Sequence, residues 1–140
     1  MRSLKISRNL PFKKNQRDLI AQFCTFCAKH LPIEKPYTVY VTDNRNRHGI
    51  STTAQYHIGK NLIEVYAKNR ALVDIMRSIA HEMTHMMQDE QGMINGPVQD
   101  AGGFHEDQAN AKAGELIKLF AKSHPKRKAI YESAKGKKVH

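Results

Sequence analysis

The chain has 140 residues, about the length of one domain, and 40% of them are hydrophobic, so it can bury a core of its own. Its few prolines and glycines argue against a disordered chain, and the lack of any run of about 18 apolar residues excludes a transmembrane helix. The net charge of +10 indicates an anionic partner or a solvated basic surface, but it does not identify a function. The first 16 residues carry charge without a following apolar segment, so we expect a cytoplasmic protein without a secretory signal and without a membrane partner.

A first helix is predicted over residues 16–31, and it ends before Pro32. Its apolar side chains recur at helical spacing, which predicts one buried stripe: Leu19, Ile20, Phe23, Cys24, Cys27 and Leu31. The two cysteines form a single C-x-x-C pair, and no second pair is present to complete a zinc ribbon. We therefore expect both thiols to lie in the core, where a free cysteine behaves as a small hydrophobic residue.

A small sheet of about three strands is predicted after this helix. Residues 37–42 alternate and are rich in Val, Tyr and Thr, which is typical of a strand. Residues 50–58 and 62–67 follow as two further strands, joined by a tight Gly-Lys-Asn turn. The Asp, Asn and Gly residues of the segment 43–49 predict a turn or loop before them.

Two more helices complete an α+β chain. Residues 71–91 are helical in pattern, with one apolar flank, one polar stripe and a glycine directly after the last residue. Residues 92–103 contain four glycines and a proline, which predicts a loop. A further helix is predicted over residues 104–123, and the basic tail after it is expected to be partly helical or loose.

The helix over residues 71–91 carries the sequence His-Glu-x-x-His at positions 81–85. Residues four apart share one face of a helix at about 6 Å, so His81 and His85 can bind one metal ion. Glu82 lies about 100° round the helix, where it can accept a proton from a water molecule beside the metal rather than bind the ion. Two buried histidines without a metal would need other hydrogen-bond partners, so we interpret the pair as zinc ligands.

A catalytic zinc site needs a third protein ligand and an open position. The next helix offers three neighbouring candidates, His105, Glu106 and Asp107. Glu106 and Asn110 lie together beside the expected buried flank, whereas Asp107 has a shorter side chain; the periodicity does not exclude His105. Asn110 would also provide the partner that a ligand histidine needs to fix its tautomer.

The motif HEMTH, followed by a helix with EDQANAKA, resembles the gluzincin metallopeptidases in their minimal single-domain form, and most nearly the ImmA/IrrE type. The second helix of that group carries a Glu-x-x-Ala-Asn signature, which Glu106, Ala109 and Asn110 match. In larger gluzincins an aspartate stands at the position of Asn110. The resemblance covers about residues 36–122 and implies a single minigluzincin-like domain over residues 1–140, with a basic tail from about residue 123.

The resemblance implies a zinc-dependent endopeptidase with one Zn²⁺ ion per chain, bound by His81, His85 and Glu106. Glu82 would then take a proton from the zinc-activated water that attacks the peptide carbonyl and pass it to the leaving amine. The family also implies that the strand within residues 51–57 is an exposed edge that pairs with an extended substrate. A further donor to the oxyanion is expected, and four side chains are candidates: Tyr56, His57, Tyr66 and His105.

Two other interpretations stay open. The positive charge suggests an SprT-like protease that acts on DNA-bound proteins. A resemblance to such enzymes would imply a third histidine beside the His-Glu-x-x-His motif and often a zinc ribbon, and this chain has no zinc ribbon. The other is a non-catalytic nucleic-acid-binding or regulatory protein with a structural zinc, which would need no base at Glu82 and would close the site with four protein ligands. The tail over residues 123–140 is either simply solvated or a weak, salt-sensitive contact for nucleic acid or another polyanion.

Overall fold

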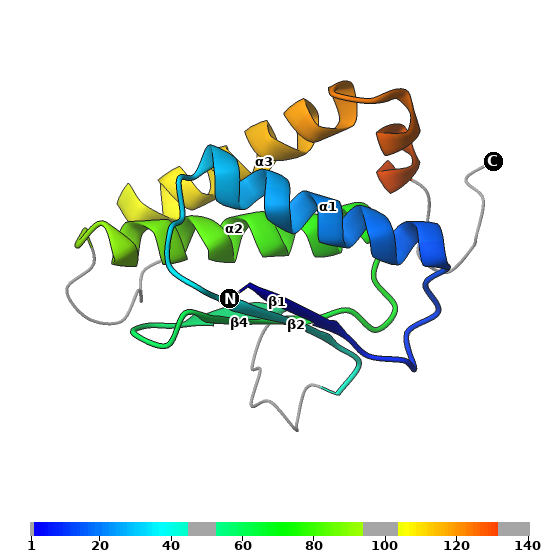
Figure 1. The fold of residues 1–140 in the computed structure, drawn as a ribbon, viewed down its shortest axis with the longest axis horizontal. Helices are drawn as coiled ribbons and strands as arrows, with labels where there is room; N and C mark the ends of the chain where they lie inside the picture. The colour runs from blue at the N-terminus through cyan, green and yellow to red at the C-terminus, as the bar shows by residue number, and fades with distance from the viewer. Residues whose placement is uncertain (1, 45–52, 94–103, 132–140) are drawn as a thin grey trace.

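The computed structural model describes residues 2–44, 53–93 and 104–131, and these form an α+β fold, as expected. A small mixed sheet forms one layer, and the helices lie together on one of its faces (Figure 1). The elements in chain order are β1 (Ser3–Ile6), α1 (Lys14–His30), β2 (Thr38–Thr42), β3 (Ala54–His57), β4 (Leu62–Tyr66), α2 (Leu72–Glu90), α3 (Phe104–Lys122) and the 3-10 helix η1 (Pro125–Tyr131). No helix in this part of the chain is long and apolar enough to cross a membrane.

The strands lie in the order β1-β2-β4-β3. β1, β2 and β4 are parallel, whereas β3 pairs antiparallel with β4 through a short hairpin. Successive side chains of a strand point to opposite faces of the sheet. Ile63 and Val65 of β4 are fully buried and join the core beneath the helices, together with Val39 and Val41 of β2. β3 is therefore an edge strand on the side of the sheet away from β1.

The expected number of about three strands was wrong, because β1 forms a fourth. Its register runs from Ser3 opposite Thr38 to Ile6 opposite Val41. Only Leu4 and Ile6 in it are apolar, and a strand this short has too few residues to show an alternating pattern among charged neighbours. The strand predicted over residues 50–58 is shorter in the structure, and its first three residues lie outside the described part, as do most of the two predicted loops and the end of the basic tail.

α1 begins two residues before its predicted start and ends one residue before its predicted end. All six residues of the predicted stripe are buried, including Cys24 and Cys27, which are free thiols. Burial raises the pKa of Cys24 from 9.0 to about 12 and raises that of Cys27 well above 9.0. Both cysteines are therefore core residues, as the sequence predicts.

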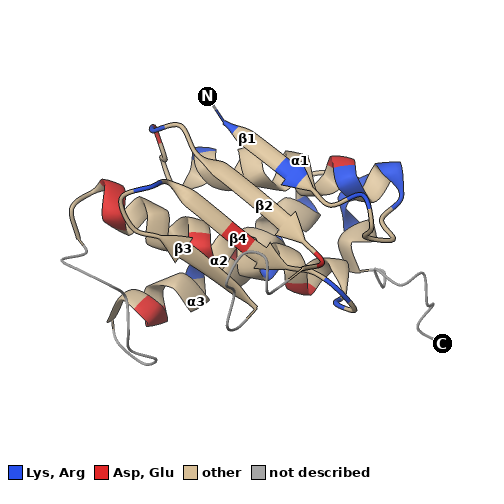
Figure 2. Cartoon of the chain, turned by 90° about the horizontal axis from the view of Figure 1, so that it is seen from below, with Lys and Arg blue, Asp and Glu red and all other residues tan. Residues whose placement is uncertain are grey.

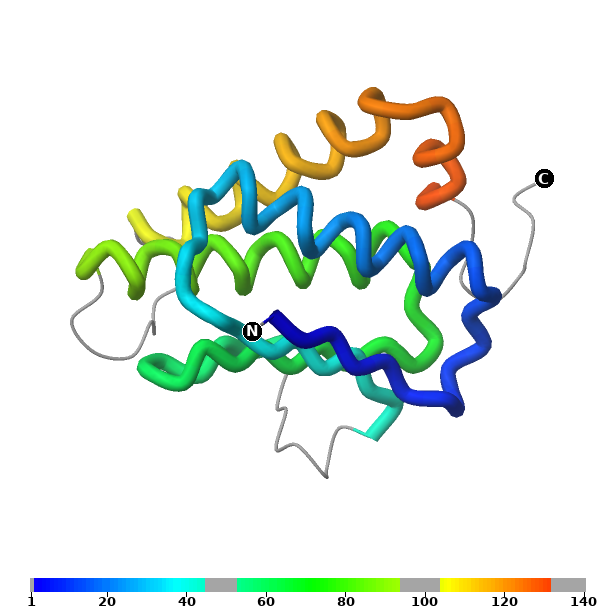
Figure 3. The backbone as a smooth tube through the Cα atoms, in the orientation of Figure 1, coloured from blue at the N-terminus to red at the C-terminus, as the bar shows by residue number. Residues whose placement is uncertain are grey.

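α2 and α3 form an antiparallel pair, since α3 runs alongside α2 in the opposite direction (Figure 3). The apolar flank predicted for α2 is buried along its whole length: Leu72, Ile75, Met76, Ile79, Ala80, Met83, Met86 and Met87. Gly92 follows α2 with a φ of +74°, a left-handed conformation that suits glycine after a helix. On α3, Ala109, Ala113, Leu116 and Phe120 are buried, but Phe104 is 67% exposed.

Two carboxylates at the end of α2 hold neighbouring segments in place. Asp89 Oδ2 accepts hydrogen bonds from the Tyr56 hydroxyl at 2.5 Å and from the Gly59 backbone N–H at 3.0 Å. Glu90 accepts the backbone N–H groups of residues 34–35. A negative charge at a helix C-terminus opposes the helix dipole, so these contacts offset an unfavourable position. Asp89 thus fixes the β3–β4 hairpin beside the half of α2 that carries the histidine pair, and Glu90 fixes the segment that precedes β2.

Candidate metal centre

The structure brings His81 and His85 of α2 together with Glu106, which lies in the first turn of α3. His81 Nε2 lies 3.2 Å from His85 Nε2 and 3.4 Å from Glu106 Oε1, and His85 Nε2 lies 2.5 Å from the same oxygen. Atoms that bind a tetrahedral zinc ion lie roughly 3.3 Å apart, so two of the three separations already suit such an ion and the third is a hydrogen-bond distance. Within the described residues this is the only group of three His, Cys, Asp or Glu side chains that could hold a metal ion.

The surroundings of His81 favour the protonation state that binds metals. Burial and the neighbouring His85 lower the pKa of His81 from 6.5, while Glu106 and a hydrogen bond with the Asn110 side chain act in the opposite direction. A neutral imidazole is the form that coordinates a metal ion. Asn110 lies one turn after Glu106 on α3 and contacts His81 through this hydrogen bond.

The partner of the other histidine is Gln88, to which the sequence interpretation assigned no role. His85 Nδ1 lies 2.9 Å from Gln88 Oε1, and Gln88 is fully buried. The signal was present in the sequence, because Gln88 continues the polar stripe of α2 one turn beyond His85. Periodicity alone could not show that this amide turns toward the imidazole.

The two neighbours of Glu106 do not join the group. Asp107 is exposed on α3. His105 packs its ring against Phe104 at 5.4 Å, and its Nδ1 is buried without a hydrogen-bond partner among the described residues. Of the three adjacent candidates for a third ligand, the structure places Glu106 beside the histidine pair.

Glu82 lies between this group and the edge strand β3. Burial, and then the charge of Glu106, raise the pKa of Glu82 to about 8, whereas a hydrogen bond from the Tyr56 backbone N–H lowers it. Glu82 is thus held by the strand rather than by the histidines. A cation bound at Glu106 would offset the charge of that carboxylate and so lower the pKa of Glu82.

The four side chains considered as oxyanion donors lie on opposite sides of the sheet, two on the side of the helices and two on the other side. His57 Nε2 lies 2.5 Å from Glu64 Oε1, and Glu64 alternates with the core residues of β4, so His57 points away from α2. Tyr66 lies two residues after Glu64 in β4, so its side chain also points away from α2. Tyr56 and His105 remain on the helix side, and the Tyr56 hydroxyl donates to Asp89.

Two imidazole nitrogens and one carboxylate oxygen form the donor set of many catalytic zinc sites, in which the fourth position stays open. His81, His85 and Glu106 could therefore hold a divalent metal ion, and zinc is one of the ions that suit this donor set. Comparison of the chain with models of protein families, with curated proteins and with solved structures found no match.

Proposed function

We propose that the protein is a zinc-dependent endopeptidase of the minimal gluzincin type, with an ImmA/IrrE-like arrangement. The observation that carries the proposal is that His81, His85 and Glu106 meet at one point while Glu82 lies outside this group and faces β3. A site with three protein ligands leaves a position for water, and a separate carboxylate beside it has the place of a general base.

The residues have distinct roles in this mechanism. A zinc ion held by His81, His85 and Glu106 would polarise the carbonyl group of a peptide bond and acidify a nearby water molecule. Glu82 accepts the proton of the attacking water and returns it to the nitrogen of the leaving amine. The hydrogen bond from Tyr56 to Glu82 keeps this carboxylate in place while it changes protonation state.

The substrate is an extended peptide segment that adds a strand to the sheet. β3 is the edge strand nearest to Glu82, and the backbone of Tyr56 contacts the Glu82 carboxylate directly. A peptide paired along the free edge of β3 would therefore pass its carbonyl groups beside the base. The contacts of Asp89 with Tyr56 and Gly59 hold that edge in position before a peptide binds.

The two alternatives predict different surroundings for the metal. An SprT-like enzyme would have a third histidine ligand, whereas the carboxylate of Glu106 lies beside the histidine pair. A structural zinc would be enclosed by four protein ligands, and within the described residues no fourth His, Cys, Asp or Glu joins the group. Both contrasts support a peptidase of the gluzincin type.

The proposal is tested with casein and a set of fluorogenic peptides. The protein is loaded with one zinc ion per chain and assayed before and after removal of the metal by a chelator. We expect cleavage that the chelator abolishes and added zinc restores. If the zinc-loaded protein cleaves none of these substrates, or if cleavage continues without metal, the proposed function is wrong.

A further inference from the structure

A single buried amide, that of Gln88, contacts both parts of the candidate metal centre. Its oxygen lies 2.9 Å from Nδ1 of His85, and its nitrogen lies 3.1 Å from the backbone oxygen of His105 and 2.8 Å from Oε1 of Gln108. Gln88 is fully buried in α2, and both of its other partners belong to α3. The amide therefore joins one ligand histidine to the turn of α3 that carries Glu106.

The orientation of the amide follows from its partners. An amide nitrogen only donates hydrogen bonds, and a backbone carbonyl oxygen only accepts them. Because the carbonyl of His105 cannot donate, the Gln88 nitrogen must face α3, and the Gln88 oxygen must face His85. A flipped amide would place its oxygen against the carbonyl oxygen of His105 in a buried place and lose this hydrogen bond.

This orientation decides which nitrogen of His85 is available. The oxygen of Gln88 accepts a hydrogen bond, so Nδ1 of His85 must carry a proton. Nε2, the nitrogen that faces His81 and Glu106, is then the one left for a metal ion. The other contact of Gln88, to the carbonyl of His105, holds the peptide group that directly precedes Glu106.

We propose that Gln88 is a positioning residue that sets the tautomer of His85 and the place of Glu106, and so arranges two of the three metal ligands at once. This inference rests on the proposed function in one respect only, the identity of the metal ligands. Partners of this kind around a ligand histidine typically change metal affinity by about 10- to 100-fold when they are removed. Gln88 touches neither the substrate nor the metal in this scheme.

Three variants separate this role from simple packing between α2 and α3. Gln88→Met keeps most of the volume but removes both hydrogen-bonding functions. Gln88→Glu keeps an oxygen that can accept from His85. Gln91→Met is the matched control, because it makes the same Gln-to-Met change at an exposed position just after α2.

The first readout is zinc affinity, measured by competition with a chromogenic chelator and corrected for the folded fraction seen by circular dichroism. We expect Gln88→Met to bind zinc about 10- to 100-fold more weakly than the unaltered protein and Gln91→Met to stay within about 3-fold of it. Gln88→Glu keeps the contact with His85 but loses the donor to α3, so its affinity should fall between these two. Equal affinity of folded Gln88→Met and the unaltered protein would overturn the inference, and so would an equal loss in Gln88→Met and Gln88→Glu, since the contact with His85 that the glutamate retains would then contribute nothing.

The second readout needs no variant. In the zinc-loaded, unaltered protein with ¹⁵N-labelled histidine, the Nδ1 proton of His85 should give a downfield NMR signal that exchanges slowly with water, because Gln88 accepts it in a buried place. A rapidly exchanging Nδ1 proton would refute the role of Gln88 even if Gln88→Met did not fold. If the unaltered protein binds no zinc, the proposed metal site itself fails; if it binds zinc but cleaves no peptide, only the peptidase activity fails and the role of Gln88 still stands or falls on these two readouts.

Discussion

Glu82 and Glu106 are the same residue type in two different surroundings. Glu106 lies within 3.4 Å of the Nε2 atoms of both histidines, whereas Glu82 accepts a hydrogen bond from the backbone of Tyr56. A carboxylate in contact with two imidazoles suits metal binding, and one held apart from them suits proton transfer. Replacing Glu106 should therefore lower the metal content and with it turnover, whereas replacing Glu82 should lower turnover alone.

The variant Glu82→Gln keeps the shape of the side chain and removes its capacity to accept a proton. We expect zinc content to stay near one per chain while peptide hydrolysis falls by about 10² or more. Atomic absorption and the fluorogenic assay measure the two quantities. Glu115→Gln, an exposed position on α3, is the matched control and should behave as the unaltered protein. Unchanged hydrolysis by zinc-loaded Glu82→Gln would mean that Glu82 is not the base.

The variant Glu106→Ala removes the oxygen that lies beside both histidines. We expect zinc binding to weaken by about 10-fold or more. His105→Ala and Asp107→Ala alter the two adjacent residues, and both should keep close to one zinc ion per chain because neither side chain joins the ligand group. Metal loss in His105→Ala together with retention in Glu106→Ala would contradict the assignment of the third ligand.

At the scale of elements, α1 carries two thiols whose protonation is linked to folding. Burial raises the pKa of Cys24 from 9.0 to about 12, and that of Cys27 is raised as well. Above pH 9 the thiols of the unfolded chain lose their protons while those of the folded chain keep them. The unfolded state then binds fewer protons, so the free energy of unfolding falls as the pH rises.

The expected loss begins near pH 9 and continues toward pH 12. Each thiol contributes a slope of up to about 1.4 kcal/mol per pH unit in this window. Urea unfolding of the protein and of the double variant Cys24→Ala, Cys27→Ala at pH 7, 9 and 10 measures the difference. At pH 7 the variant should be less stable than the unaltered protein, because the smaller alanine side chains leave cavities in the core. Its free energy of unfolding should nevertheless fall less steeply as the pH rises. Parallel pH profiles of the two proteins would show that the thiols do not contribute.

The sequence predicted the elements that have a clear period and missed those that depend on contacts across the fold. α1 and α2 were predicted to within two residues of their ends, because both have long stripes of apolar residues. β1 was missed because it is stabilised by its pairing with β2, more than 30 residues away in the chain, and not by its own pattern. A strand of this kind becomes visible only when its partner is known.

The candidate site shows the same division. The spacing of His81 and His85 is local, so a helix predicts directly that the two residues share a face. Glu106 required a choice among three neighbours, because the crossing of α2 and α3 decides which side chain reaches the pair. The contacts of Gln88 could not be predicted without the packing of both helices, since its three hydrogen bonds connect α2 with α3 and fix one amide orientation.

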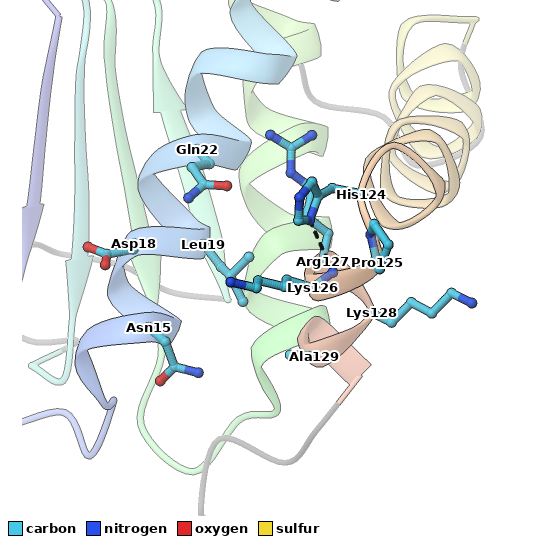
Figure 4. A pocket seen from close by; sticks show the side chains of 10 residues that line it. All are labelled: Asn15, Asp18, Leu19, Gln22, His124, Pro125, Lys126, Arg127, Lys128 and Ala129. Carbon is cyan, nitrogen blue, oxygen red and sulfur yellow. Dashed lines mark hydrogen bonds between the residues drawn. The ribbon is translucent and has the colours of Figure 1, made fainter.

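At the scale of the whole molecule, the charges are unevenly placed. Viewed from the side of the sheet, acidic residues mark the end of α2 and the start of α3, and Lys and Arg mark the first half of α1 (Figure 2). A groove of about 720 Å³ lies between α1 and η1, lined by His124, Lys126 and Lys128 on the η1 side. Figure 4 shows the Lys126 side chain pointing across this groove toward α1.

This groove gives the polyanion contact of the basic tail a testable location. A chain that ends at Ser123 would also lose Ile130, which is fully buried in the core. Charge-reversing substitutions therefore test the lysines without removing a core residue. If Lys126 and Lys128 bind phosphate or sulfate groups, the double variant to Glu should leave a heparin column at lower salt. The slope of log affinity against log salt should fall by about 2.

A control with the same change of charge is needed, because any loss of positive charge weakens binding to a polyanion. Lys29→Glu with Lys60→Glu changes two exposed lysines outside the groove by the same amount. We expect this control to leave the column at higher salt than the Lys126, Lys128 variant. Equal elution of the two double variants would show that the net charge alone, and no particular surface, determines the retention.

The position of β1 also affects how this protein behaves in solution. β1 covers one side of β2, so the hydrogen-bonding groups of β2 on that side are satisfied within the chain. A chain shortened to begin after Ile6 would expose them as an open edge, which is a template for strand exchange between copies. Such a protein should self-associate as its concentration rises, although His81, His85 and Glu106 are all present. Preparations of this protein should therefore keep the first residues, and sedimentation should be measured for any preparation in which they have been removed.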